Sequence, residues 1–153
     1  MSQSWGGSDF SYNDLSRSDE LLRYYDLSIV ETTIEDGHTV YTIDAFPHDD
    51  SPVVWGKETM VVRDDYVLLS QTFFDQSLTP IKRLETQRVE EMGGRNIGVL
   101  MRMSNLEEPQ EWTEIEYFEP DFDAHIADRK LTLFSLTSGR LCRSPFTRAR
   151  GRW

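Results

Sequence analysis

The close spacing of strand-like segments restricts the fold of this chain more than any other feature. About six or seven runs rich in β-branched and aromatic residues follow one another between Leu27 and Leu136, with short turns between them and no long amphipathic helix. Parallel neighbours would need crossover connections of about a dozen residues or more, and the connections here are too short. The sequence therefore predicts an all-β fold, an antiparallel meander, as one domain over residues 1–136.

Local turn and helix signals support this arrangement. Asp36–Gly37 lies between two β-rich runs, as in a tight hairpin, and Gly93–Gly94 ends a long polar strand. The acidic pair Asp64–Asp65 predicts a two-residue turn between strands at 53–62 and 66–75. Before the first strand, loose capping-box spacings predict one or two short helices between Tyr12 and Tyr25. The only helical part we expect is thus a small N-terminal segment.

Apolar residues occur on both faces of the segment from Val53 to Asp75, so each face needs a cover. We expect one face to line a cavity for an apolar guest, although a plain core between the sheet and the helix would use the same residues. A shift of one residue in register would exchange the two faces. The predicted ligand-binding residues of the inner face are Tyr41, Ile43, Trp55, Leu69, Phe73, Val99, Met101, Ile115 and Tyr117.

Charge is distributed unevenly along the 153 residues, whose net charge is −11. An acidic body repels phosphate backbones, so no nucleic-acid partner is expected. Residues 140–153 reverse the sign, with five arginines and no acidic residue, and residues 137–153 are predicted to be a disordered basic tail. The chain shows no signal peptide, and no apolar run is long enough for a transmembrane segment.

Motifs for catalysis or metal binding are weak. His48–Asp50 lacks a second ligand cluster, and Asp64–Asp65 does not resemble a calcium loop, so both are interpreted as solvated turns. Glu114 and Glu116 share a strand face, which is better explained as a solvated face than as paired catalytic carboxylates. No serine or cysteine lies in a nucleophile motif. We expect no enzyme activity, no cofactor and no metal.

Four blocks of sequence carry a family resemblance. They are SWGGSDFSYNDL (4–15), DSPVVWGKETMVVRDDYVLLSQTFFDQ (50–76), KRLETQRVEEMGGRNIGVLMRMSN (82–105) and TEIEYFEPDFDAHIADRKLTLFSL (113–136). In their order and spacing they resemble the C-terminal part of the outer-membrane lipoprotein-sorting (LolA/LolB-like) family, most closely its uncharacterised LolA-like branch. The signal peptide and the N-terminal part of the family's barrel have no counterpart in this sequence.

This resemblance implies a curved, incomplete half-barrel with helices at its open side. It also implies non-catalytic binding of a lipid or a lipidated protein, in the periplasm or at the outer-membrane periphery, for lipoprotein sorting or envelope maintenance. The alternative is a protein-interaction or envelope stress-sensing module, in which the same sheet docks an envelope protein partner. In either case an exposed strand edge would favour self-association.

Overall fold

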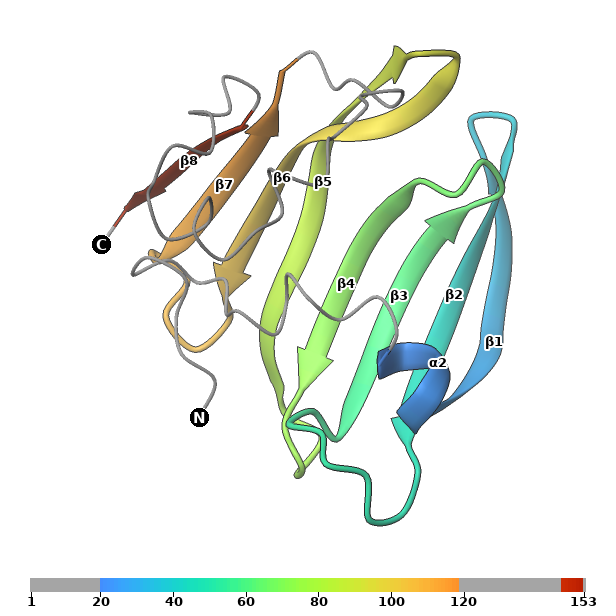
Figure 1. The fold of residues 1–153 in the computed structure, drawn as a ribbon, viewed down its shortest axis with the longest axis vertical. Helices are drawn as coiled ribbons and strands as arrows, with labels where there is room; N and C mark the ends of the chain where they lie inside the picture. Colours follow the sequence, from blue (N-terminus) through green and yellow to red (C-terminus); the bar gives the residue numbers. More distant parts are fainter. Residues whose placement is uncertain (1–19, 119–146, 153) are drawn as a thin grey trace, which may run out of the picture.

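The described part of the protein, residues 20–118 and 147–152 of a computed structural model, is one antiparallel sheet with a short helix (Figure 1). The elements are α2 (Glu20–Tyr24), β1 (Tyr25–Glu35), β2 (His38–Pro47), β3 (Lys57–Arg63), β4 (Leu68–Phe74), β5 (Pro80–Met92), β6 (Arg95–Asn105), β7 (Trp112–Tyr117) and β8 (Thr147–Arg152). The strands lie side by side in the order β1 to β8, and each pair is antiparallel. The predicted all-β meander is confirmed.

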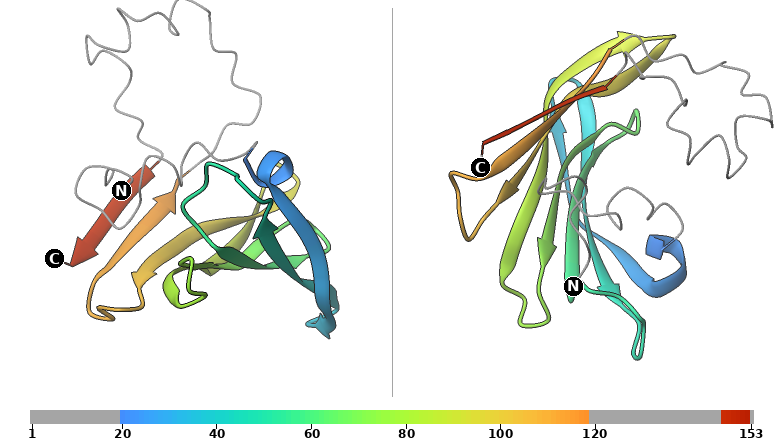
Figure 2. Two further views of the ribbon diagram at one scale, coloured as in Figure 1. Left: turned by 90° about the horizontal axis from the view of Figure 1, so that it is seen from below. Right: turned by 60° about the vertical axis from the view of Figure 1, so that its left-hand side comes forward.

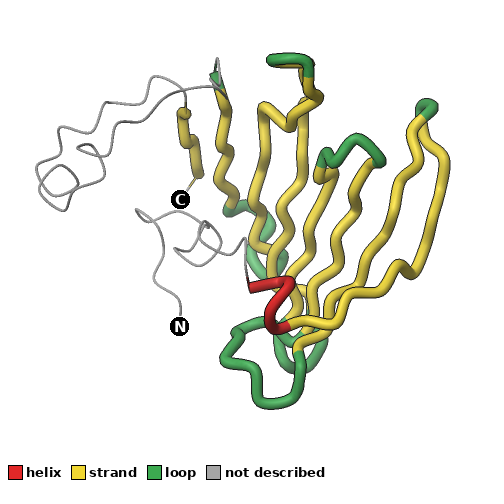
Figure 3. Tube along the Cα trace, turned by 45° about the vertical axis from the view of Figure 1, so that its right-hand side comes forward, coloured by secondary structure: helices red, strands yellow, loops and turns green. Residues whose placement is uncertain are grey.

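The sheet is strongly curved, and α2 lies on its concave side (Figure 2). Figure 3 shows this helix at the start of β1, against the end of the neighbouring strands. The predicted small helical segment is therefore present at residues 20–24, while the rest of the predicted helical region lies outside the described residues. Among the described residues no helix has the length and apolar character needed to cross a membrane.

The concave side, here called the inner face, carries the hydrophobic core. One cluster joins Phe73, Met103 and Ile115, with Trp55 and Leu84 packed against it. A second cluster joins Tyr25, Ala45 and Met60, and α2 contributes Leu21 and Tyr24 to its border. Strand residues that pair directly across neighbouring strands point to the same side of the sheet, so each strand gives its alternate apolar residues to this core.

The opposite, convex side, here called the outer face, carries several ion pairs. Lys57 Nζ lies 2.8 Å from Asp44 Oδ2, and Arg102 Nη2 lies 2.7 Å from Glu114 Oε1. Burial acts to raise the pKa of the Asp44 carboxyl, but the hydrogen bonds from Lys57 and Thr59 and the charge of Lys57 together lower it below its usual value. Aromatic side chains also lie on this face, where Lys57 Nζ is 5.4 Å and 5.2 Å from the ring centroids of Phe46 and Phe74. The larger apolar clusters lie on the inner face, which is therefore the face that most needs an apolar cover.

The apparent apolar second face of the segment 53–75 has a simple explanation. Strand β3 begins at Lys57, not at Val53, so residues 53–56 form a loop and the predicted start of this strand is wrong. The Gly56 N–H donates to the Phe74 carbonyl at 3.0 Å, and a Cβ on Gly56 would lie only 2.4 Å from the Asp75 carbonyl oxygen. This close approach fixes the loop against the end of β4.

Two of the predicted turns are confirmed, and a third is longer than expected. Asp36–Gly37 (φ 51° and 83°) and Gly93–Gly94 (φ 60° and 72°) each have two consecutive positive φ values, as the tight hairpin turns favoured between twisted strands require. Between β3 and β4 the turn continues past Asp64–Asp65, because Tyr66 adopts φ 69° and Arg63 N–H donates to the Val67 carbonyl at 2.9 Å. Strand β4 therefore starts only at Leu68.

The predicted basic tail contains a strand. Thr147–Arg152 forms β8, which pairs with β7 at one end of the sheet and places Arg150 opposite Glu114 in the register. These six residues thus differ from the disordered segment that composition predicted. The proposed domain boundary after residue 136 falls outside the described residues and stays a prediction.

The turn between β4 and β5 supplies a test of backbone strain. Leu78 adopts φ 61° and its side chain is 52% exposed. An L-residue in this left-handed conformation costs about 1–2 kcal/mol. Glycine avoids this strain, but part of the gain in stability is lost because glycine has more conformational entropy in the unfolded chain. Leu78→Gly should therefore raise the free energy of unfolding by roughly 0.5–1 kcal/mol, measured by urea denaturation. Leu78→Val keeps the Cβ atom and should lower stability; a less stable Gly variant would contradict the strain argument.

Candidate functional site

Strand register brings most of the predicted binding residues to the inner face. Tyr41 pairs with Val62, Ile43 pairs with Met60, and Met101 pairs with Ile115. Tyr117 is two positions along β7 from Ile115 and so shares its side of the sheet. Phe73 belongs to the same face through its core cluster.

Three of the predicted residues reach their positions by other means. Trp55 lies in the β2–β3 loop and places its ring 5.3 Å from that of Phe73. Leu69 is passed over by a register shift between β3 and β4, and Leu68 packs against the Tyr25–Ala45–Met60 cluster in its place. Val99 is fully buried beside another register shift, between β5 and β6. Simple alternation cannot assign a face to a residue at such a shift.

The inner face is divided between a closed core and partly accessible apolar residues. Phe73 and Ile115 are 3% and 4% exposed and form the core. Tyr41, Ile43 and Met101 are only half-buried. Together with Tyr117, which is 36% exposed, these side chains are predicted residues that a ligand could contact without displacing the core.

Polar and charged groups also belong to the inner face, and the sequence interpretation did not include them. Glu58 is fully buried, and Gln71 Nε2 donates to its carboxylate at 2.6 Å. Glu58 pairs with Phe73, which pairs in turn with Lys82 on β5. Lys82 Nζ lies 5.1 Å from the ring centroids of both Trp55 and Phe73, at cation–π distance. This end of the face therefore combines apolar walls with buried charges of both signs.

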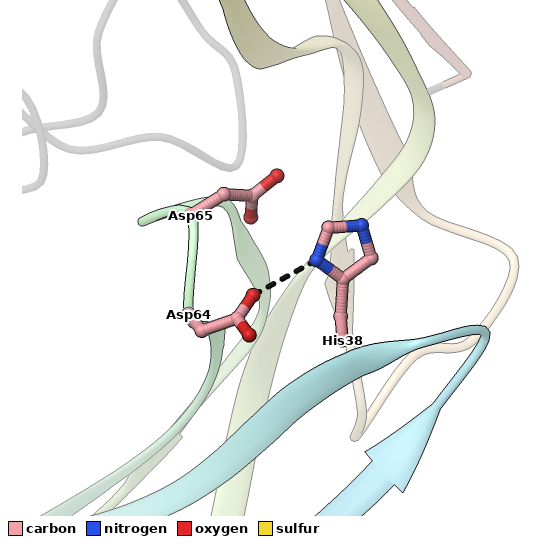
Figure 4. Close-up of side chains that lie close together, drawn as sticks. All are labelled: His38, Asp64 and Asp65. Atoms are coloured by element: carbon pink, nitrogen blue, oxygen red, sulfur yellow. Dashed lines mark hydrogen bonds and ion pairs between the residues drawn. The ribbon is translucent and has the colours of Figure 1, made fainter.

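The acidic pair in the β3–β4 turn connects neighbouring hairpins (Figure 4). Asp64 Oδ1 lies 2.8 Å from His38 Nδ1, and the Thr39 N–H donates to Asp64 Oδ2 at 2.9 Å. These hydrogen bonds, first that from Thr39 and then that from His38, lower the pKa of the Asp64 carboxyl. Asp64 thus ties its own turn to the β1–β2 hairpin.

Asp65 ties the same turn to β6. Arg63 Nε donates to Asp65 Oδ1 at 3.0 Å while Arg63 Nη2 contacts Oδ2, and Asn96 Nδ2 donates to Oδ2 at 2.9 Å. The Arg63 guanidinium holds the pKa of the Asp65 carboxyl well below its usual range. His38, Asp64 and Asp65 place their ligand atoms within 4.8 Å of one another. The guanidinium bonded to Asp65 opposes a further cation there, so the arrangement supports the structural interpretation of this turn.

A hollow of about 690 Å³ lies beside this turn. Its lining residues are Asp65, Tyr66, Gly94, Arg95, Asn96 and Ile97. None of the predicted inner-face residues belongs to the hollow, and Tyr66 and Ile97 are the large apolar or aromatic residues in its lining. Its composition does not suit a long apolar chain.

The turn supplies a test in which stability depends on pH. Asp65→Asn should lower the free energy of unfolding by about 1–2 kcal/mol at neutral pH, because it removes a charge-assisted pair. A carboxyl with a depressed folded-state pKa stabilises the fold above its unfolded pKa of about 3.9, and that contribution is lost as the pH falls through the folded pKa. The difference between the two proteins in urea denaturation should be constant above about pH 5 and shrink below about pH 4.

The control is Glu91→Gln, which removes an exposed carboxylate of β5. This variant should unfold like the original protein across the same pH range. A deficit for Asp65→Asn that stayed constant down to about pH 2 would show that the side chain acts through shape and not through its charge.

Comparisons with known proteins agree with the geometry of the sheet. The model of a family described as an uncharacterized protein matches residues 1–138. A comparison with curated proteins gave no match. Among solved structures, a DUF1329 family protein from Desulfovibrio piger is 22% identical with a TM-score of 0.75, covering 87% of this chain and 55% of that chain.

Two further solved structures share the fold. A domain assigned to an outer membrane lipoprotein-sorting protein from Vibrio parahaemolyticus is 20% identical with a TM-score of 0.72, covering 86% of this chain and 55% of that chain. A LolA superfamily protein from Nitrosomonas europaea is 16% identical with a TM-score of 0.66, covering 86% of this chain and 59% of that chain. At these identities the likeness establishes the fold, and this chain spans little more than half the length of each solved chain.

Proposed function

The chain belongs to a LolA-like family of uncharacterized proteins, and on this premise we propose that its inner sheet face binds the acyl chain of a lipid or lipidated protein. The observation that carries the proposal is that apolar side chains of the concave surface, Tyr41 and Ile43 on β2 and Met101 on β6, are only half-buried beside a closed core. Of the solved structures with this fold, one is described as a domain of a lipoprotein-sorting protein and another as a LolA superfamily protein. A role in lipoprotein sorting or envelope maintenance follows as part of the proposal.

The energetics of such binding are favourable without special polar groups. Each buried methylene contributes roughly 0.8 kcal/mol, so about ten methylenes contribute ~8 kcal/mol before the cost of association. Binding by burial alone needs an apolar surface of suitable width, and among the described residues the inner face carries the two apolar clusters. On the outer face an acyl chain would desolvate ion pairs such as Arg102–Glu114 without replacing their contacts with water.

The proposed role is one of carriage or capture and requires no chemical step. Its natural location is the periplasm or the outer-membrane periphery, where lipidated proteins are moved between membranes.

An alternative function, docking of an envelope protein by the same sheet, is favoured by one observation: Ile29 and Ile34 on β1 are 62% and 81% exposed. Large exposed apolar groups on a strand often mark an interaction surface.

Native mass spectrometry of the purified protein, followed by organic extraction, tests the acyl proposal directly. We expect co-purifying lipid or fatty acid that added fatty acid displaces. An apo protein that also fails to bind a fluorescent fatty acid would contradict the proposal and favour the docking alternative.

A matched pair of variants tests which face binds. Met101→Lys places a charge on the inner face, whereas Leu100→Lys places the same charge on the outer face, opposite Glu116. If the guest loses contact with about two or three methylenes, Met101→Lys should weaken fluorescent fatty-acid binding at least about tenfold. Leu100→Lys should bind as the original protein does. Equal effects of the two substitutions would contradict an inner-face site.

A further inference from the structure

Strand β1 is a long strand at the end of the sheet (Figure 1). It has 11 residues and pairs along one side with β2, while no described strand lies along its other side. Nine of its residues are exposed, all except Tyr25 and Thr33. An edge of this kind presents a row of backbone N–H and C=O groups to whatever approaches it.

Large apolar side chains of β1 point to the inner face. Leu27 pairs with Ala45, Ile29 pairs with Ile43, and Ile34 pairs with Thr39. Leu27, Ile29 and Ile34 are 45%, 62% and 81% exposed. A strand added beside β1 would bring its own alternate side chains against these residues and extend the core by one row.

The other side of β1 is acidic. Asp26, Glu31 and Glu35 share the outer face, and β1 contains no lysine or arginine. A neighbouring strand with basic residues on this face would place opposite charges side by side, which stabilises cross-strand pairs. The edge therefore favours an occupant that is apolar on one face and basic on the other.

A second copy of β1 is a poor occupant for the same reason. Pairing of two β1 strands about a twofold axis would put the carboxylates of both copies on one shared face, with no basic residue from either strand to offset them. Like charges in adjacent strands destabilise a sheet. The charge pattern thus argues against symmetric self-association through this edge.

The edge also lacks most of the features that keep strand edges apart. Natural edges are protected by lysine, proline, short length or bulges, and β1 has only a register shift between Ile29 and Glu31. The solved chains of the same fold are longer, since this chain covers 55%, 55% and 59% of them.

We propose that the edge of β1, along which no described strand lies, binds an extended polypeptide strand whose residues alternate between apolar and basic, so that the sheet continues by one strand. The backbone of the added strand pairs with β1, its apolar side chains cover Leu27, Ile29 and Ile34, and its basic side chains face Asp26, Glu31 and Glu35. This edge adjoins the acyl surface at Ile43, which pairs with Ile29, whereas Met101 lies on β6, well away from the edge.

The test uses a fluorescein-labelled peptide of about 11 residues in which valine alternates with lysine. We expect saturable binding by fluorescence anisotropy at about 50 mM salt, weakened at least about tenfold at about 500 mM salt. The same peptide with glutamate in place of lysine should bind at least about tenfold more weakly. Hydrogen exchange should show new protection of the β1 amides when the lysine peptide binds.

A charge-reversal variant makes the test specific to this edge. Glu31→Lys/Glu35→Lys should reverse the preference, binding the glutamate peptide more tightly than the lysine peptide. Glu91→Lys/Glu107→Lys changes the net charge equally at exposed positions outside β1 and should keep the original preference. Circular dichroism and thermal unfolding confirm that both variants fold.

Several results would overturn the proposal. One is the absence of peptide binding, and another is a preference that charge reversal on β1 does not change. Protection of β1 that rises with protein concentration alone, with dimers in sedimentation, would assign the edge to a second copy. Displacement of the peptide by fatty acid in the Met101→Lys variant would assign the edge to an acyl chain. Failure of fatty-acid binding with intact peptide binding would overturn only the acyl proposal.

Discussion

One-sided burial is the constraint on which the rest of this structure depends. The described chain has a single sheet layer and one short helix, and its two clusters of buried apolar residues lie on the concave side. Curvature brings Phe73, Met103 and Ile115 together, and the β2–β3 loop adds Trp55 to them. The outer face then has to be compatible with water, and its ion pairs meet that requirement. The same constraint leaves apolar side chains only half-covered towards β1 and β2.

Sequence reasoning predicted the elements better than the details of the faces. Short connections and the Asp36–Gly37 and Gly93–Gly94 turns were sufficient for the meander, because tight turns and the absence of crossovers leave few other topologies. Pairing places Ile43, Met101 and Ile115 on the inner face, and their role in binding stays a prediction. Leu69 shows where the reasoning fails: strict alternation selects it, but a register shift puts Leu68 against the core in its place. Bulges depend on contacts between strands, and local patterns do not record them.

Charged residues show the same limit in another form. From the sequence alone, a carboxylate such as Glu58 in a strand is interpreted as solvent-exposed, since an ionised side chain is rarely buried without partners. Here Gln71 contacts it across the sheet, and Lys82 lies over two aromatic rings nearby. The sequence likewise predicts only a turn at Asp64 and Asp65. In the structure these two residues join three hairpins through contacts with His38, Arg63 and Asn96. These roles follow from tertiary neighbours far apart in the sequence. They could not be assigned before the strands were placed.

The simple strand order has a kinetic consequence. From β1 to β7 each strand pairs only with its neighbours in the sequence, and the connections between them are short. A chain of this kind closes small loops and has a low contact order for an all-β protein, so it can form hairpin by hairpin at modest entropic cost. Unfolding can be equally local. A terminal strand such as β1 can detach while β3 to β6 keep their pairing, and amide exchange would then rise from the middle of the sheet towards its ends.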